Sequence, residues 1–387
     1  MAIHNIQMVD LHKQYLAIKN EVDAAIAGVI ENTQFINGDE VKLFQKELED
    51  YLGVKHVIPC ANGTDALQIA LMALGLKPGD EVITSDFTFA ATVEVVGLLQ
   101  LKIVLVDVDP NTYCIDTDKL KKAITPKTKA IIPVHLFGQC ADMEAIMQIA
   151  NAHQIAVVED TAQAIGATYT FNNGITKKAG TIGTLGTTSF FPSKNLGCYG
   201  DGGALFTNDD NLAEIARSIV NHGMKVRYYY DRIGVNSRLD TIQAAILRVK
   251  LRHLDEYAAA RNKAAAYYDE AFKNHPNIKT PVRDEKSTHV FHQYTLVGCS
   301  VDNFELQKRL TEKGVPCMIY YPVPLHTQEA YRTPEMKDED FEITNGLCKS
   351  VFSLPMHTEL TNEELKYITT TVLEEVDRMS VNRKIYG

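Results

Sequence analysis

The sequence predicts an α/β fold, in which a large domain with a mainly parallel sheet between helices is followed by a smaller α+β domain. First, short apolar strand patterns alternate with helical patterns from residue 57 onward, and such alternation is typical of right-handed βαβ units. Second, residues 155–160 form an apolar run that ends in acidic residues, as in a parallel strand buried on both faces. Third, a chain of 387 residues exceeds one hydrophobic core, so we expect two domains.

The elements of the large domain can be placed in chain order. Amphipathic helical patterns cover residues 22–30 and 40–51. Strands are expected at 57–58, 81–84, 102–106, 130–134, 156–159, 187–191 and 204–207, with helices between most of them at 64–74, 90–99, 116–124 and 143–153. The glycine- and lysine-bearing stretch 173–186 is expected to be a loop over the candidate functional site.

The alanine-rich stretch 239–272 is too long for one ordinary helix. We interpret it as the connection between the domains and expect it to break near His253. The patterns at 290–297, 304–313 and 363–379 then belong to the smaller α+β domain. The predicted division is therefore an N-terminal arm and large domain at 1–250 and a C-terminal domain at 251–387.

Composition excludes several classes of function. Hydrophobic residues make up 45% and charged residues 23%. The net charge of −10 argues against an unspecific nucleic-acid binder. The seven cysteines have no Cys-x-x-Cys spacing, as expected for reduced thiols in a cytoplasm. No apolar run reaches membrane-spanning length and no signal-peptide pattern is present. No metal-binding pattern is present, so no metal site is expected. The P-loop and dinucleotide-binding fingerprints are absent too.

A lysine at the edge of a glycine-rich turn is the first candidate catalytic residue. The sequence SFFPSKNLG at 189–197 places Lys194 between an expected strand and the segment CYGDGGA at 198–204. Glycines let a backbone approach a ligand closely, and a crowded lysine amine loses its proton more easily, which suits a Schiff-base nucleophile. A lone lysine would instead be a surface residue, so this interpretation depends on the other motifs.

A carboxylate is the second candidate. Asp160 follows the expected strand 156–159 in the sequence IAVVEDTAQA, and open α/β sheets bind ligands at the carboxyl ends of their strands. A carboxylate there can keep the ring nitrogen of pyridoxal phosphate protonated, which makes that cofactor an electron sink. The alternative for an isolated aspartate is an N-cap of the following helix.

A helix start supplies the third motif. The sequence CANGTDAL at 60–67 joins a strand to a helix, and free N–H groups at a helix N-terminus form an anion site. Gly63 would let a phosphate come close, while Thr64 and Ser189 would add hydroxyl groups. An ordinary helix cap gives the same pattern.

Together these motifs resemble those of the DegT-type (DegT/DnrJ/StrS) sugar aminotransferases, which are fold-type I enzymes that depend on pyridoxal phosphate. The resemblance covers essentially the whole chain. It rests on VDL at 9–11, ANGTDAL at 61–67, PGDEVI at 78–83, EDTAQA at 159–164, the Lys194 block, GVNSRLDTIQAA at 234–245 and YYPVPLH at 320–326. It implies a mainly parallel sheet of the seven-stranded type in the large domain.

The resemblance also implies a role for each site residue. Lys194 would form the Schiff base with the cofactor and Asp160 would pair with its pyridine nitrogen, so both are expected to be catalytic. The other expected cofactor contacts are Gln163 near the ring oxygen, Gly63, Thr64 and Ser189 at the phosphate, Phe89 stacked on the ring, and Asn236 reaching the phosphate from the other subunit of a homodimer. Arg238 and His326 are expected to contact the substrate. Phe89 could instead be a core aromatic, and Arg238 could cap a helix or pair with Asp240.

The implied reaction moves an amino group from L-glutamate to a ketosugar joined to a nucleoside diphosphate. Dehydratase members of the family carry histidine at the position of Lys194, so the lysine favours transamination. The resemblance is greatest to members that act at C3. We expect UDP-2-acetamido-2-deoxy-3-oxo-glucuronate as substrate, in cytoplasmic synthesis of cell-surface polysaccharide (O-antigen) sugars. A dTDP-3-oxo-6-deoxyhexose or a 4-keto sugar is the alternative, and a non-catalytic pyridoxal-phosphate-binding regulator is the alternative from another class.

Overall fold

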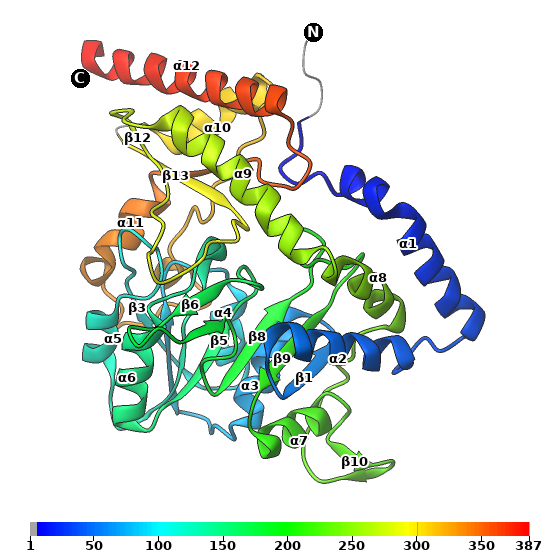
Figure 1. The fold of residues 1–387 in the computed structure, drawn as a ribbon. Coiled ribbons are helices and arrows are strands. Elements are labelled where there is room, and N and C mark those ends of the chain that lie inside the picture. The colour runs from blue at the N-terminus through cyan, green and yellow to red at the C-terminus, as the bar shows by residue number, and fades with distance from the viewer. Residues whose placement is uncertain (1–5, 300, 387) are drawn as a thin grey trace.

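The computed structural model describes residues 6–299 and 301–386. Its larger body is a seven-stranded sheet between helices, and a smaller body with its own three-stranded sheet covers one end of it (Figure 1). This arrangement confirms the α/β fold expected from the sequence.

The large sheet is parallel except for one strand. Its order is β1 (His56–Cys60), β9 (Gly203–Thr207), β8 (Leu185–Ser189), β5 (Ala156–Asp160), β4 (Thr128–Ile132), β2 (Glu81–Ser85) and β3 (Lys102–Val106). Only β9 runs against its neighbours β1 and β8, whereas the other pairs are parallel. All seven expected strands are therefore present, with ends that differ by a few residues.

Alternate residues of the strands enter two apolar cores. Val82, Ile132 and Val158 pack beneath α3 (Gly63–Ala73), α4 (Ala91–Leu98) and α7 (Asp210–Ile219). Ile83 and Val157 face the opposite core, which includes residues of α5 (Thr117–Ala123) and α6 (Met143–His153). Because side chains alternate between the faces of a strand, consecutive apolar residues fill both cores.

The long alanine-rich stretch breaks where expected. Helix α8 (Thr241–Leu251) ends just before His253 and α9 (Leu254–Phe272) begins just after it. Helix α1 (Leu11–Asn32) packs Ile18 and Val22 against α8, and α2 (Asp39–Leu52) lies against the same side of the large body. The division of the chain into domains at residue 250 stays a prediction.

The smaller body is an antiparallel sheet covered by helices. The sheet consists of β12 (Ile278–Lys279), β13 (Tyr294–Gly298) and β14 (Val351–Leu354). Tyr268 of α9, Leu306 of α10 (Asn303–Glu312) and Ile368 of α12 (Asn362–Tyr386) share its core with Phe352. The remaining helical elements are α11 (Glu342–Cys348) and short 3-10 turns at Leu136–Gly138, Leu325–Thr327 and Asp338–Phe341.

Two segments depart from expectation. Residues 173–186 were expected to be a loop over the site, but β6 (Thr168–Thr170) and β7 (Thr176–Lys178) form a hairpin there. The following turn is held by Glu159, whose carboxylate accepts the N–H groups of Gly180, Ile182 and Gly183 at 2.6–2.9 Å. The strand expected at 290–297 begins only at Tyr294, because Phe291 has a φ of +45°, outside the β region.

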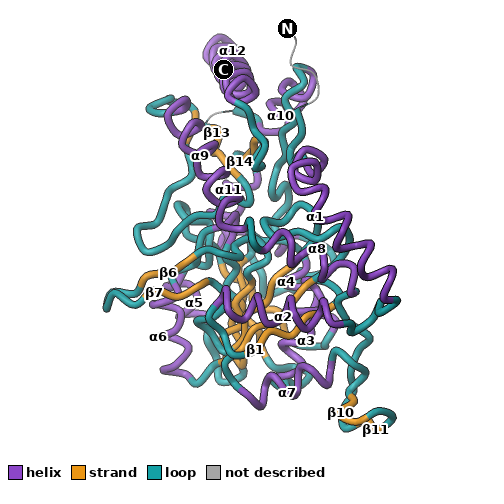
Figure 2. Tube along the Cα trace, turned by 45° about the vertical axis from the view of Figure 1, so that its right-hand side comes forward, coloured by secondary structure: helices purple, strands orange, loops and turns teal. Residues whose placement is uncertain are grey.

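A second hairpin projects from the large body at the end opposite α12. It consists of β10 (Met224–Val226) and β11 (Tyr229–Tyr230) (Figure 2). Three of its tyrosines are exposed, namely Tyr228, Tyr229 and Tyr230. Across the described ranges, no helix combines the length and apolar character needed to cross a bilayer, and no group of acidic, histidine and cysteine side chains is arranged to hold a metal ion.

Candidate functional site

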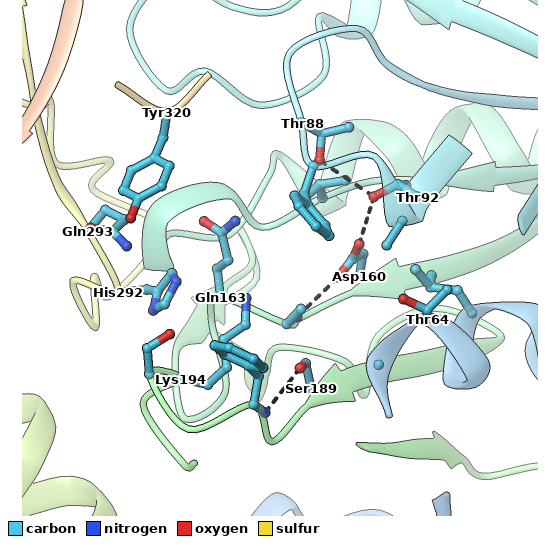
Figure 3. Close-up of a pocket in the computed structure, with 18 of the residues that line it drawn as sticks. Thr64, Thr88, Thr92, Asp160, Gln163, Ser189, Lys194, His292, Gln293 and Tyr320 are labelled. Carbon is cyan, nitrogen blue, oxygen red and sulfur yellow. Dashed lines mark hydrogen bonds between the residues drawn. The ribbon is translucent and has the colours of Figure 1, made fainter. Parts of the chain in front are cut away.

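A cavity of about 790 Å³ lies at the carboxyl ends of β5 and β8, where open α/β sheets bind their ligands. It brings together seven of the residues singled out from the sequence. These are Gly63, Thr64, Phe89, Asp160, Gln163, Ser189 and Lys194. Figure 3 shows most of their side chains converging on one space.

One end of the cavity is built to receive an anion. Helix α3 starts at Gly63, and its N-cap Asn62 accepts a hydrogen bond of 2.7 Å from the N–H of Asp65. A Cβ at Gly63 would lie 2.7 Å from Cβ of Ser189, so only glycine lets the helix start lie so close to the end of β8. The free N–H groups of this turn and the hydroxyls of Thr64 and Ser189 can then share one anionic group.

Asp160 is a fixed carboxylate in the wall of the same cavity. It ends β5 and is 5% exposed. Its Oδ1 accepts the N–H of Ala162 at 3.1 Å and its Oδ2 accepts the hydroxyl of Thr92 at 3.0 Å. These bonds leave lone pairs on both oxygens, so the carboxylate can still pair with a protonated ring nitrogen.

Lys194 lies in the turn after β8, with its backbone N–H bonded to the carbonyl of Phe191 at 2.8 Å. Burial lowers the pKa of its amine from 10.5 to about 8, although the nearby charge of Asp160 acts in the opposite direction. A substantial neutral fraction is therefore present near pH 8. This is the form that can act as a nucleophile or accept a proton.

Gln163 and Phe89 also line the cavity. Gln163 accepts the N–H of Phe137 at 2.8 Å and donates to the hydroxyl of Tyr321 at 3.0 Å, so its amide has a fixed orientation. Phe89 is 58% exposed and lines the cavity. Its ring is therefore available to a ligand and is not part of the core.

Three of the expected site residues lie outside the cavity of the single chain. Asn236 is exposed beside the β10–β11 hairpin, and Arg238 donates to Oδ1 of Asn221 at 3.3 Å. His326 is buried, with Nδ1 2.7 Å from Oδ2 of Asp86 and Nε2 3.0 Å from Oδ1 of Asp338. The roles given to these three residues stay predictions.

The cavity also contains residues that sequence reasoning missed. They are Thr88, Thr92, Phe191, Asp201, His292, Gln293, Tyr320 and Tyr321. Tyr320 and Tyr321 belong to the YYPVPLH motif, which was the one signal for this wall. Thr92 sits in a mainly apolar helix, and His292 was expected on a strand, so neither had a recognisable pattern.

This donor set fits the pyridoxal phosphate expected from the sequence. The space at the start of α3, which a Cβ at Gly63 would fill, suits a phosphate. The carboxylate of Asp160 suits a pyridinium, and Lys194 supplies an amine of lowered pKa on the same cavity. Each of the three groups that such a cofactor needs is therefore present.

Comparison with known proteins supports the family expected from the sequence. The model of the DegT/DnrJ/EryC1/StrS aminotransferase family matches residues 16–373. A UDP-2-acetamido-2-deoxy-3-oxo-D-glucuronate aminotransferase of Pseudomonas aeruginosa is 49% identical over 94% of this chain and 98% of its own. A pleiotropic regulatory protein of Geobacillus stearothermophilus is 46% identical over 96% of this chain and 98% of its own.

The likeness extends to three dimensions. The crystal structure of NtdA from Bacillus subtilis, with the bound cofactor PMP, superposes with a TM-score of 0.87. It is 30% identical and the match covers 97% of this chain and 86% of that one.

Proposed function

Because the chain belongs to the DegT/DnrJ/EryC1/StrS aminotransferase family, we propose that it moves the amino group of glutamate to the C3 ketone of a nucleotide-linked sugar. It is a pyridoxal-phosphate-dependent aminotransferase. The observation that carries the proposal is that Lys194 and Asp160 line one cavity together with the helix start at Gly63, which can bind an anion. The name of the Pseudomonas relative supports UDP-2-acetamido-2-deoxy-3-oxo-glucuronate as the acceptor. Synthesis of cell-surface polysaccharide (O-antigen) sugars in the cytoplasm is the corresponding role.

Different residues of the chain have different roles in the reaction. When bound, pyridoxal phosphate supplies an electron sink for the carbon that loses a proton. Asp160 keeps the ring nitrogen protonated, and its bonds to Thr92 and Ala162 hold the carboxylate in place. Gly63, Thr64 and Ser189 would hold the phosphate, and Phe89 would contact the ring.

Lys194 moves the proton. Its Nζ can take the proton from Cα of glutamate and later deliver a proton to C3 of the sugar, because its pKa of about 8 allows both forms near neutral pH. A positioned acid–base group of this kind contributes roughly a hundred- to ten-thousand-fold in rate. One side chain therefore serves both halves of the reaction.

We extend the proposal to a homodimer with shared sites. Asn236 and Arg238 lie next to the projecting β10–β11 hairpin, outside the cavity of their own chain. In a two-fold dimer the same surface of a second copy can reach the cavity. Arg238 would then meet the carboxylate of a uronic acid as a bidentate partner, and Asn236 would meet the cofactor phosphate.

The name of the Geobacillus relative favours one other candidate, a regulator that binds the cofactor without turnover. Absorbance separates the two. An aminotransferase converts its bound cofactor to the pyridoxamine form when glutamate is added, whereas a sensor keeps the pyridoxal form. An unchanged spectrum with saturating glutamate would refute the enzyme proposal.

The substrate is tested by supplying glutamate with a panel of 3-oxo and 4-oxo sugar nucleotides. We expect turnover with UDP-2-acetamido-2-deoxy-3-oxo-glucuronate and little with its 4-oxo counterparts. A clear preference for dTDP-3-oxo-6-deoxyhexoses would contradict the proposed acceptor while leaving the reaction type intact.

A further inference from the structure

The loop at residues 289–293, which enters the small domain, has an unusual local conformation. Phe291 has a φ of +45°, and non-glycine residues rarely adopt positive φ. Nδ1 of His289 accepts the N–H of Phe291 at 3.0 Å, and the two rings stack with centroids 3.8 Å apart. Strained backbone of this kind persists only where surrounding contacts hold it, and such places are often functional.

Contacts from both domains hold this loop. Arg261 of α9 is 2% exposed and donates from Nη1 to the carbonyls of Phe291 and Met356, both at 2.9 Å. Asn195, the residue after Lys194, donates from Nδ2 to the carbonyl of Val290 at 2.8 Å. The position of the loop is therefore coupled directly to the turn that bears Lys194.

The result of this arrangement is that His292 lines the cavity. Its side chain is 5% exposed, and its Nδ1 is buried without a hydrogen-bond partner among the residues that the structure describes. Burial, with the charges of Lys194 and Arg261, holds the pKa of the ring well below its usual value, so the imidazole is neutral. Buried polar atoms are nearly always paired, so an unpaired ring nitrogen on a side chain that lines a cavity points to a ligand.

The surroundings of His292 indicate the chemistry of that ligand. His292, Gln293 and Tyr320 lie together on one side of the cavity, with Thr64 and Thr92 on the other and Lys194 between (Figure 3). Lys194 is the only lysine or arginine among the described residues that line the cavity. Neutral groups that donate and accept hydrogen bonds suit hydroxyl and acetamido groups, whereas the two carboxylates of glutamate would need cations.

We propose that His292 is a specificity-determining residue that hydrogen-bonds to the ring substituents of the sugar acceptor and not to the amino donor. This inference rests on the proposed function. It predicts that loss of the imidazole impairs the half-reaction with the ketosugar and spares the half-reaction with glutamate. It also predicts weaker binding of sugar nucleotides that cannot react.

The test compares His292→Leu, which keeps a similar volume, with His292→Asn, which keeps a donor and an acceptor. Stopped-flow absorbance follows each half-reaction of the holoenzyme separately, and calorimetry measures binding of UDP-N-acetylglucosamine. For His292→Leu we expect the sugar half-reaction to fall at least about tenfold in kcat/KM, since a buried hydrogen-bonding partner is lost. The UDP-N-acetylglucosamine Kd should rise at least about fivefold, with intermediate values for His292→Asn.

Two controls separate this role from a structural one. His275→Leu removes a histidine of the small domain that bonds Asp377 outside the cavity, and it should leave both half-reactions unchanged. The melting temperature of His292→Leu should not fall, because the buried Nδ1 of His292 has no hydrogen-bond partner among the described residues. Equal losses in both half-reactions, a normal sugar half-reaction, or a normal UDP-N-acetylglucosamine Kd would overturn the inference. A parent protein that does not react with glutamate would instead refute the proposed function, and the binding measurement would still judge His292.

Discussion

The hydroxyl of Thr92 donates a hydrogen bond of 3.0 Å to Oδ2 of Asp160. This bond joins the first turn of α4 to the end of β5. It holds the carboxylate that we propose to pair with the cofactor ring, and Thr92 is 1% exposed. The bond is therefore shielded from water, and a buried hydrogen bond is stronger than one at the surface.

Replacing Thr92 by Val should weaken cofactor binding. A hydrogen bond to a charged group contributes about 1.5–3 kcal/mol, so we expect the Kd for pyridoxal phosphate to rise about tenfold or more and kcat to fall. Titration of the apoprotein by absorbance measures the first effect. Thr92→Ser keeps the hydroxyl and should stay near the parent value; equal behaviour of the two variants would refute this role.

Replacing Asp160 by Asn should leave the cofactor bound but slow transamination. The amide is close in shape to the carboxylate but carries no charge to hold the ring nitrogen protonated. Removal of one electrostatic contact from an active site lowers kcat by about a hundred- to a thousandfold. Single-turnover rates with glutamate check this, and an undiminished rate would exclude the assigned role.

Replacing Lys250 by Met should stabilise the protein, because burial lowers the pKa of this lysine from 10.5 to about 8. Lys250 is 1% exposed, and its amine has no hydrogen-bond partner among the described residues. Below about pH 8 the lysine is charged in both the folded and unfolded states, and its burial costs up to about 3 kcal/mol. The gain should shrink between pH 8 and 10.5, where the folded lysine has lost its proton and the unfolded one has not.

Denaturant unfolding of the parent and Lys250→Met proteins at pH 7, 9 and 10.5 measures this gain. The difference in the free energy of unfolding should be largest at pH 7 and smallest at pH 10.5. A variant less stable than the parent at pH 7 would show that the amine has a partner in the assembled protein.

Mixed dimers should recover activity if Asn236 acts across the subunit interface. Subunits carrying Lys194→Ala and subunits carrying Asn236→Ala would each be defective alone. In an equal mixture about half of the dimers are mixed and each has one complete site, so about a quarter of the parent activity should return. Size-exclusion chromatography confirms the dimers, and an inactive mixture would place Asn236 outside a shared site.

The residues that could be predicted are those whose role is visible in local sequence. Lys194, Asp160 and Gly63 each stand where a strand pattern meets glycine or a helix start, and the alternating patterns predicted all seven strands of the sheet. Their meeting in one cavity follows from parallel topology, which brings the carboxyl ends of strands to one edge.

The residues that could not be predicted depend on distant contacts. His292 enters the cavity because Phe291 adopts positive φ and Arg261 and Asn195 hold its loop, and no local pattern signals this. Thr92 has its role only because Asp160 lies opposite. A loop was expected at residues 173–186 because their composition is typical of turns. The structure instead has a hairpin at residues 168–178. The roles proposed for Asn236 and Arg238 depend on a second chain.

The most direct test of the account is to find where the cofactor is attached. Borohydride reduction of the protein with bound pyridoxal phosphate, followed by proteolysis and mass spectrometry, should place the label on the peptide that contains Lys194 and on that residue alone. A label on another lysine, or no label in a protein that binds the cofactor, would contradict the assignment of Lys194 and with it the proposed reaction.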